Sequence, residues 1–186
     1  MTNRRTFIKN SSLVVAGVAV ASTMPMAACK GANEKLVCGL IGANGMGWAD
    51  LSAFLKQPNT ECAAICDVDE NVLNRRISET EKLQGKKPVG FKDYRKLLEM
   101  PGIDVVIIGT PDHWHCLPMV EACQAGKDVY CEKPLGNSIE EINIMERAAA
   151  KYKTVVQVGM WQRSDPHWRY AVDFVIALSC PLTHCL

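Results

Sequence analysis

The sequence has little net charge, and this shortage argues against one class of partner. Its 186 residues carry a formal net charge of +1. A nearly neutral chain offers no electrostatic reason to bind nucleic acid, so we expect no such partner. No segment is of low complexity, and no repeat with a period of about 20–50 residues occurs, which excludes solenoids and propellers. The length and the 48% apolar content fit one soluble domain with a single core.

A long hydrophobic run is also missing. The N-terminal apolar stretch, residues 13–21, is shorter than the roughly 20 residues that span a bilayer. It follows two adjacent arginines, Arg4 and Arg5, so residues 1–30 resemble a twin-arginine export signal. The competing interpretation is a basic tail ahead of a core helix.

The end of this segment, "MAAC" (residues 26–29), resembles a lipobox, although Met stands where Leu is usual. The pattern predicts a lipid anchor on Cys29, with plain cleavage nearby as the alternative. We therefore expect an exported protein, either periplasmic or anchored to a membrane as a lipoprotein.

Nine cysteines in an exported chain would suggest a disulfide framework, but their positions favour another interpretation. Cys38, Cys66 and Cys131 lie within or at the ends of predicted core strands, where a thiol behaves as a small hydrophobic group. Cys62 and Cys66 have CxxxC spacing without a matching second pair, which argues against zinc. Twin-arginine export carries folded proteins, so the thiols can be buried before they meet an oxidising compartment.

Strand-like and helix-like patterns alternate after the leader. We expect strands over residues 35–41, 61–67, 103–111, 127–134 and 154–160. We expect helices over residues 47–57, 69–83, 93–100, 115–126 and 138–153, and a loop over 85–93. Strict alternation predicts an α/β fold of the Rossmann type, a doubly wound, mostly parallel sheet for which we expect six strands. Ligands of such folds bind beyond the carboxyl ends of the strands.

The turn after the first strand, "GANGMG" (residues 42–47), resembles a dinucleotide-binding turn, except that Asn44 occupies the second glycine position of G-x-G-x-x-G. Gly42 permits a tight turn, and Gly47 lets the following helix approach the strand closely. Asn44 is acceptable because asparagine tolerates the left-handed conformation, and Gly45 relieves crowding. Taken alone, the pattern also fits a structural strand–turn–helix corner.

Asp67 ends the second strand, roughly 20–25 residues after the turn, where an acid accepts hydrogen bonds from the adenosine ribose. A carboxylate there also repels a 2′-phosphate, and no arginine follows it directly. The cofactor expected is therefore NAD rather than NADP. The alternative role for Asp67 is the N-cap of the next helix, for which Asp69 is better placed.

The stretch "GTPDHWHC" (residues 109–116) collects polar and ring-bearing side chains at a strand end. A helix start explains Asp112 but leaves both histidines and Trp114 unexplained. His113 and His115 are two residues apart, so they do not share a helix face, and no third ligand is evident. We predict no metal site.

The stretch "YCEKPLGNS" (residues 130–138) places Lys133 at the end of a strand, before a proline that fixes the backbone. A lysine on this rim can hold or polarise a substrate hydroxyl. The alternative is an exposed ion pair with Glu132, which contributes little.

The glycine turn, Asp67, "TPDHWH" and "EKP" in this order resemble the glucose–fructose oxidoreductase/inositol dehydrogenase family (Gfo/Idh/MocA) over residues 35–175. The resemblance implies a catalytic role for Lys133, and an approach of Gln162 and Arg163 to cofactor or substrate. It also implies NAD(P) bound by Gly42, Asn44, Gly45, Met46, Gly47, Asp67, Thr110, Pro111, His113, His115 and Glu132.

Family members continue into a second α/β domain that supplies substrate contacts. Here residues 166–186 predict a helix that leads into an atypical tail, "IALSCPLTHCL", so we expect residues 31–165 to be the Rossmann domain and the second domain to be absent. The function expected is the NAD-binding domain of an exported oxidoreductase acting on sugars or polyols, inactive by itself. The alternatives are a fragment of an NAD-dependent glycoside hydrolase of the same family and a non-catalytic remnant. Oligomerisation is left open.

Overall fold

The structure is a computed structural model that describes residues 35–176. The expected export signal, Cys29 and residues 177–186 lie outside the described residues. The strands are β1 (Leu36–Ile41), β2 (Thr60–Cys66), β3 (Val89–Phe91), β4 (Val105–Ile108), β5 (Asp128–Glu132) and β6 (Val156–Gly159). The α-helices are α2 (Gly45–Phe54), α3 (Glu70–Gln84), α4 (Tyr94–Leu98), α5 (Cys116–Gln124), α6 (Ile139–Tyr152) and α7 (Pro166–Tyr170). Short helical turns are η1 (Asp112–Trp114), η2 (Trp161–Ser164) and the π-helical η3 (Ala171–Ile176).

The six strands form one sheet in the order β3-β2-β1-β4-β5-β6, and all neighbouring strands are parallel. This confirms the predicted six-stranded, doubly wound sheet. The chain first adds β2 and β3 on one side of β1 and then adds β4, β5 and β6 on the other. The connections from β1 and from β4 therefore run in opposite directions along the sheet. The gap between β1 and β4 is the topological switch point, and sheets of this kind bind ligands at the carboxyl ends of the strands beside it.

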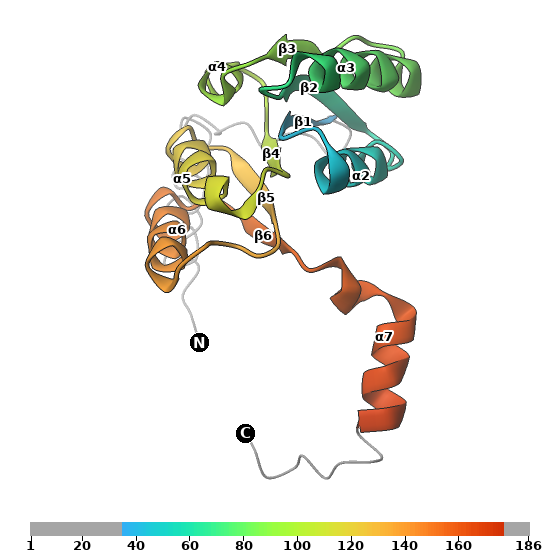
Figure 1. Cartoon of the computed structure of the whole chain (residues 1–186), viewed down its shortest axis with the longest axis vertical. Coiled ribbons are helices and arrows are strands. Elements are labelled where there is room, and N and C mark those ends of the chain that lie inside the picture. The colour runs from blue at the N-terminus through green and yellow to red at the C-terminus, as the bar shows by residue number, and fades with distance from the viewer. Residues whose placement is uncertain (1–34, 177–186) are drawn as a thin grey trace, which may run out of the picture. The chain divides into compact units, whose positions relative to one another are not determined.

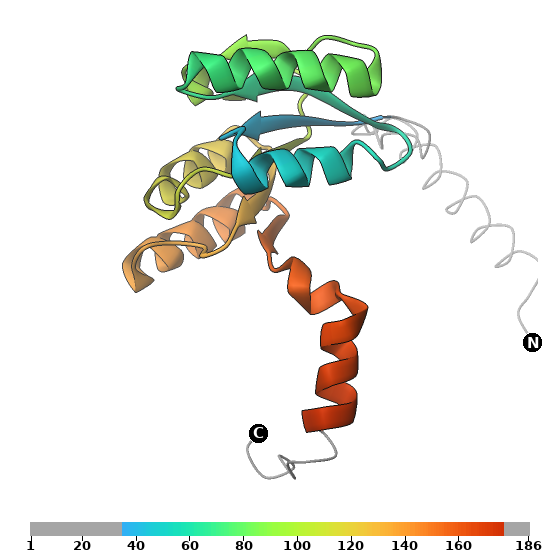
Figure 2. The ribbon, with the colours of Figure 1, turned by 45° about the vertical axis from the view of Figure 1, so that its right-hand side comes forward.

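Helices cover both faces of the sheet. Figure 1 shows α2 on one side and α5 on the other. The turned view in Figure 2 shows α2 and α3 side by side. The guanidinium carbon of Arg76, on α3, lies 4.5 Å from the centroid of the Trp48 ring, on α2. Since strands covered on both faces need apolar residues at successive positions, this arrangement explains the continuous apolar runs of β1 and β4.

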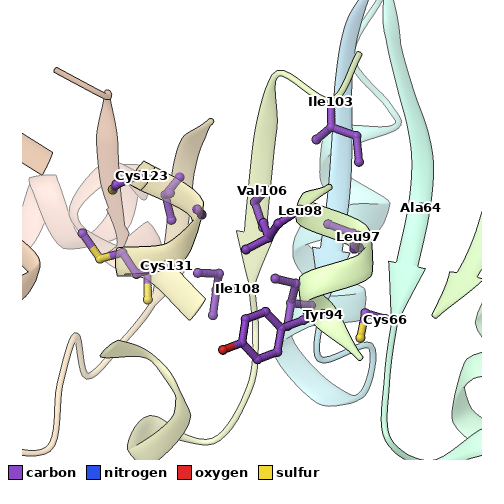
Figure 3. Packing of buried hydrophobic residues seen from close by; sticks show 14 of the residues in the cluster. Ala64, Cys66, Tyr94, Leu97, Leu98, Ile103, Val106, Ile108, Cys123 and Cys131 are labelled. Atoms are coloured by element: carbon purple, nitrogen blue, oxygen red, sulfur yellow. The ribbon is translucent and has the colours of Figure 1, made fainter. Parts of the chain in front are cut away.

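Each face has its own hydrophobic cluster. In Figure 3, Tyr94, Leu97 and Leu98 of α4 pack beside Val106 and Ile108 of β4. This cluster extends under α5 and α6. The second cluster lies under α2 and α3 and contains Leu40, Leu51, Ile65, Leu73 and Ile107. The two clusters pack against opposite faces of the central strands. The carboxyl ends of these strands form the candidate site.

Cysteines are part of both clusters, as the sequence predicts. Cys38, Cys66 and Cys131 are buried, and the six cysteines in the described part of the chain are free thiols. Burial raises the pKa of Cys66 and of Cys131 to about 12 in each case. These groups therefore stay protonated at neutral pH and act as small hydrophobic side chains.

Side-chain caps fix the starts of α3 and α6, and the cap of α3, Asp69, is the one expected from the sequence. Asp69 caps α3 by accepting hydrogen bonds from the amides of Asn71 and Val72. Ser138 caps α6 by accepting from the amide of Glu141 at 3.2 Å. The Glu141 carboxylate reaches back to the amide of Asn137 at 2.7 Å, one residue before the position that a capping box predicts.

The prediction of a loop over residues 85–93 was wrong in its centre, because β3 pairs there with β2 from Ala64 to Cys66. The strand has three residues, too few for a periodic pattern, and Gly90 interrupts its apolar character. Gly90 is useful at this position, since a Cβ there would lie 2.6 Å from Ile77 Cδ1 of α3.

After β6 the described chain continues through η2, α7 and η3. Asp165 caps α7 by accepting from the amide of His167. Trp168, Tyr170 and Phe174 are exposed by 47%, 60% and 56% of their surface. Between residues 35 and 176, none of the helices is long and apolar enough to cross a bilayer.

Candidate cofactor-binding site

A cavity of about 590 Å³ opens beyond the carboxyl ends of β1, β2, β3 and β4. Parallel pairing brings these ends to one edge of the sheet, which explains why residues distant in sequence share the cavity. Its wall contains six of the predicted cofactor residues: Gly42, Asn44, Asp67, Thr110, Pro111 and His113. Trp114, within the stretch at residues 109–116 that the sequence singles out, also lines it. The wall further contains residues that were not predicted: Val68, Lys92, Asp93, Tyr94 and Arg95.

The turn between β1 and α2 is built from glycines that leave no space for a side chain. Gly42 has a φ of 81°, and a Cβ on it would lie 2.7 Å from the amide nitrogen of Thr110. A Cβ on Gly47 would lie 2.0 Å from the carbonyl oxygen of Gly42. A Cβ on Gly109, at the end of β4, would lie 2.4 Å from the Cα of Gly47. Three backbones therefore meet within contact distance, and the amino end of α2 is held at the cavity.

Asn44 does not adopt the left-handed conformation that we expected. Its φ of −99° and ψ of 169° are extended, and it is the N-cap of α2 without a side-chain cap bond. Gly45 takes the positive φ instead, at 48°, with no atom near its missing Cβ. The residue with the positive φ is therefore Gly45, one position after Asn44, where we expected it. Asparagine can stand at the second glycine position because that position is extended. Met46 follows at the start of α2 and is 39% exposed.

Asp67 joins the end of β2 to the glycine turn. Its Oδ2 accepts a hydrogen bond from the amide of Ala43 at 2.8 Å, and its Oδ1 accepts from the amide of Asp69 at 2.9 Å. Since Asp69 caps α3, Asp67 is not the helix cap. The carboxylate is fixed on the cavity wall with acceptor capacity remaining on both oxygens.

Arg76 holds the same turn from the other side, and the sequence analysis missed it. Its Nε donates to the carbonyl of Ala43 at 3.1 Å, and its Nη1 donates to Glu79 Oε2. Ala43 is thus bound through its amide by Asp67 and through its carbonyl by Arg76. The signal in the sequence was only an arginine within a charged helix, so nothing distinguished it from its neighbour Arg75.

The cations beside Asp67 on the cavity wall are paired with acids. Lys92 Nζ lies 2.8 Å from Glu70 Oε2. Arg95 lies 3.6 Å from Asp93 Oδ1 through Nη1 and 3.4 Å from Glu121 Oε2 through Nε. This pairing weakens their attraction for a 2′-phosphate, and the nearby Asp67 carboxylate repels one.

The turn after β4 is tied to the turn after β5 by one buried side chain. His115 is 1% exposed, and its Nδ1 lies 2.7 Å from the carbonyl oxygen of Pro134 while its Nε2 lies 2.8 Å from that of Thr110. His115 is therefore not on the cavity wall, whereas His113 is, with its Nδ1 3.5 Å from Asp112.

Lys133 and Glu132 lie at the same sheet edge but outside the cavity wall. Lys133 is exposed and joined to Pro134 by a cis peptide bond. Glu132 is 3% exposed, and its Oε2 accepts from the amide of Lys133 at 3.3 Å. The contact between them thus uses the lysine backbone, and no ion pair joins the two side chains in the described part of the chain. Within residues 35–176 no cluster of three metal-ligating side chains occurs.

The geometry agrees with comparisons to known proteins. The family model described as "Oxidoreductase family, NAD-binding Rossmann fold" (GFO_IDH_MocA) matches residues 36–160. The chain belongs to this family. A curated relative is the uncharacterized oxidoreductase YrbE of Bacillus subtilis, 29% identical over 137 residues, which cover 74% of this chain and 39% of the relative. Another is the alpha-N-acetylgalactosaminidase of Shewanella oneidensis, 30% identical over 160 residues, with coverage of 75% and 35%.

Among solved structures, the scyllo-inositol dehydrogenase of Lactobacillus casei with bound NAD(H) and scyllo-inositol superposes with a TM-score of 0.69 at 26% identity. The match covers 76% of this chain and 41% of that one. The chain thus spans about two fifths of the length of its relatives. The family and the fold predicted from the motifs are confirmed.

Proposed function

We propose that this chain is the NAD-binding domain of an oxidoreductase that acts on sugars or polyols. The observation that carries the proposal is the fixed Asp67 carboxylate, held beside the close-packed glycine turn on the wall of the 590 Å³ cavity. A dinucleotide fits this arrangement, since its pyrophosphate needs a turn without side chains and its ribose needs an acceptor.

The predicted contact residues divide by their place in the structure. Gly42, Asn44, Gly45, Met46 and Gly47 would hold the pyrophosphate, and Asp67 would accept from the ribose hydroxyls. Thr110, Pro111 and His113 lie farther along the wall, toward the turn that His115 ties to the "EKP" stretch. NAD, when bound, supplies the hydride acceptor.

Lys133 is the proposed catalytic residue. It is exposed at the end of β5, so its ammonium can reach a substrate hydroxyl outside the cavity wall. Glu132 fixes the backbone of this lysine rather than its charge. Lysine at this rim can orient the hydroxyl and take part in its proton transfer.

Titration of the purified chain with NAD and with NADP tests the cofactor assignment. We expect saturable binding of NAD with the tighter dissociation constant. Tighter binding of NADP, or no binding of either nucleotide by a folded sample, would contradict it. Lys133→Ala should leave NAD binding unchanged, since this side chain lies outside the cavity wall.

Cleavage of glycosides with transient use of NAD is the second candidate, favoured by the similarity to the alpha-N-acetylgalactosaminidase. Export would favour it as well, because free NAD is scarce outside the cytoplasm and a redox-neutral reaction regenerates its cofactor. A complete protein of this kind would cleave substrate without net consumption of NAD, whereas a dehydrogenase would reduce NAD in proportion to product.

Export by the twin-arginine route, with a lipid anchor on Cys29, completes the proposal. It is supported by Arg4 and Arg5 ahead of the short apolar stretch and by the "MAAC" sequence. Arg4→Lys/Arg5→Lys in a reporter fusion should retain the protein in the cytoplasm. Cys29→Ala should abolish labelling with radioactive palmitate while the unmodified fusion is labelled.

A further inference from the structure

Two acidic side chains, the half-buried Asp50 and the buried Glu132, lie on the face of the sheet that α2 covers. Asp50 comes from α2, and Glu132 is the last residue of β5. Asp50 Oδ2 and Glu132 Oε1 are both buried atoms, and neither has a hydrogen-bond partner among the described residues. The two carboxyl groups interact, because the charge of Glu132 is, after burial, among the causes that raise the pKa of Asp50. Two carboxylates cannot hydrogen-bond to each other, because both would be acceptors, so a proton is needed to satisfy the two buried oxygens.

The surroundings hold the Glu132 carboxylate in place. Glu132 pairs with Gly159 of β6 in the sheet register, and a Cβ on Gly159 would lie 2.0 Å from Glu132 Oε1. The carboxylate therefore occupies the space that a side chain at position 159 would fill. Its other oxygen, Oε2, accepts from the amide of Lys133.

We propose that Asp50 and Glu132 share one proton, and that this acid pair is a positioning device for Lys133. The shared proton lies between Asp50 and Glu132 Oε1, which leaves Oε2 free to hold the Lys133 amide. Loss of the proton would leave two negative charges side by side and largely shielded from water, where their repulsion and their desolvation are costly. Glu132 would then shift and release the backbone of Lys133. The proposal rests on the proposed role of Lys133, but the acid pair itself does not.

Titration behaviour agrees with the geometry. Burial and then the charge of Glu132 raise the pKa of Asp50 from 3.8 to about 6. Burial and the charges of Asp50 and Glu132 raise the pKa of Tyr130, two residues before Glu132 on the same strand face, to about 12. Tyr130 therefore stays uncharged at neutral pH and adds no charge to the pair. Gly159, opposite on β6, brings no charge.

Nuclear magnetic resonance of the full chain tests the proposal. We expect the amide signal of Lys133 to shift as pH rises through about 6. Asp50→Asn supplies a permanent donor in place of the shared proton, so the shift should vanish in that variant. Glu132→Gln should abolish it as well. Glu146→Gln, which removes an exposed acid from α6, should leave it unchanged.

Stability gives a second measurement. Because the folded pKa of Asp50 is raised, its contribution is fully present below about 3.8 and is lost as pH rises through about 6. The wild-type melting temperature should therefore fall relative to that of Asp50→Asn over this interval. Infrared spectra of the wild type should show a protonated carboxyl band at pH 5 that fades over the same interval.

A Lys133 amide shift that persists in Asp50→Asn would overturn the proposal, as would the lack of a protonated carboxyl band in the wild type. Neither measurement uses NAD or substrate. Failure of nucleotide binding would therefore refute the proposed function but not the acid pair. Failure of the amide and infrared measurements would refute the acid pair but not the proposed function.

Discussion

The amide of Ala43 donates to Asp67 Oδ2 at 2.8 Å, so the carboxylate proposed to bind ribose also holds the glycine turn. One side chain thereby links the end of β2 to the turn that follows β1. Any change at Asp67 acts on both the proposed ribose contact and the shape of the pyrophosphate turn. A loss of NAD affinity in an Asp67 variant therefore has to be compared with the melting temperature of the same variant.

Asp67→Ala should weaken NAD binding by about 1–3 kcal/mol, the range for a hydrogen bond made by a charged group. Calorimetric titration of variant and wild type measures the difference. Asp67→Asn keeps an acceptor and removes the charge, so it should retain part of the NAD affinity and lose less discrimination against NADP than alanine does. If Asp67→Ala binds NAD as tightly as the wild type does, the ribose assignment is wrong.

Arg76→Ala should lower NAD affinity although Arg76 does not line the cavity. Its Nε bond to the carbonyl of Ala43 is lost, and so is the contact with Trp48, together worth on the order of 1–3 kcal/mol in holding the turn. Arg75→Ala is the matched control, since it removes the same charge from an exposed position of the same helix. If both variants lower the NAD affinity equally, Arg76 contributes only its charge and not its bond to Ala43.

Gly47→Ala should destabilise the domain more than Gly45→Ala does. A Cβ at position 47 would collide with the carbonyl oxygen of Gly42, and backbone has to move, at a cost of about 1–3 kcal/mol or more. At position 45 there is space, and only the positive φ opposes alanine, at roughly 1–2 kcal/mol. Urea unfolding of both variants measures the order, and a larger loss in Gly45→Ala would contradict the packing argument.

The sequence predicts the sheet well because β1 and β4 are continuous apolar runs and the helices carry explicit caps such as Asp69 and Ser138. It also predicts which turns reach the binding edge, since parallel strands place their carboxyl ends together. It could not predict β3, whose three residues have no period, or the wall segment that follows it from Lys92 to Arg95. Nor could it predict partners brought together only by the fold, as Arg76 with Ala43 and Asp50 with Glu132.

A preparation of these 186 residues alone should bind NAD but not turn over sugars or polyols at the rate of a complete enzyme. Hydride transfer needs cofactor, substrate hydroxyl and lysine in near-attack geometry, and such positioning supplies roughly 7–11 kcal/mol of the barrier. The described residues offer a cofactor cavity and the exposed Lys133, whereas the matched part of the chain covers only about two fifths of its relatives. Lys133 is exposed and is not part of the cavity wall, so a substrate at its ammonium would stay in contact with water.

Two assays decide this last prediction: NADH formation with a panel of polyols, and release of sugar from a panel of glycosides. Both should stay near background in a sample that binds NAD and melts cooperatively. Lys133→Ala should then show the same background as the wild type, because the lysine has no positioned substrate to act on. Turnover that is robust in the wild type and lost in Lys133→Ala would show instead that these residues form a complete active site.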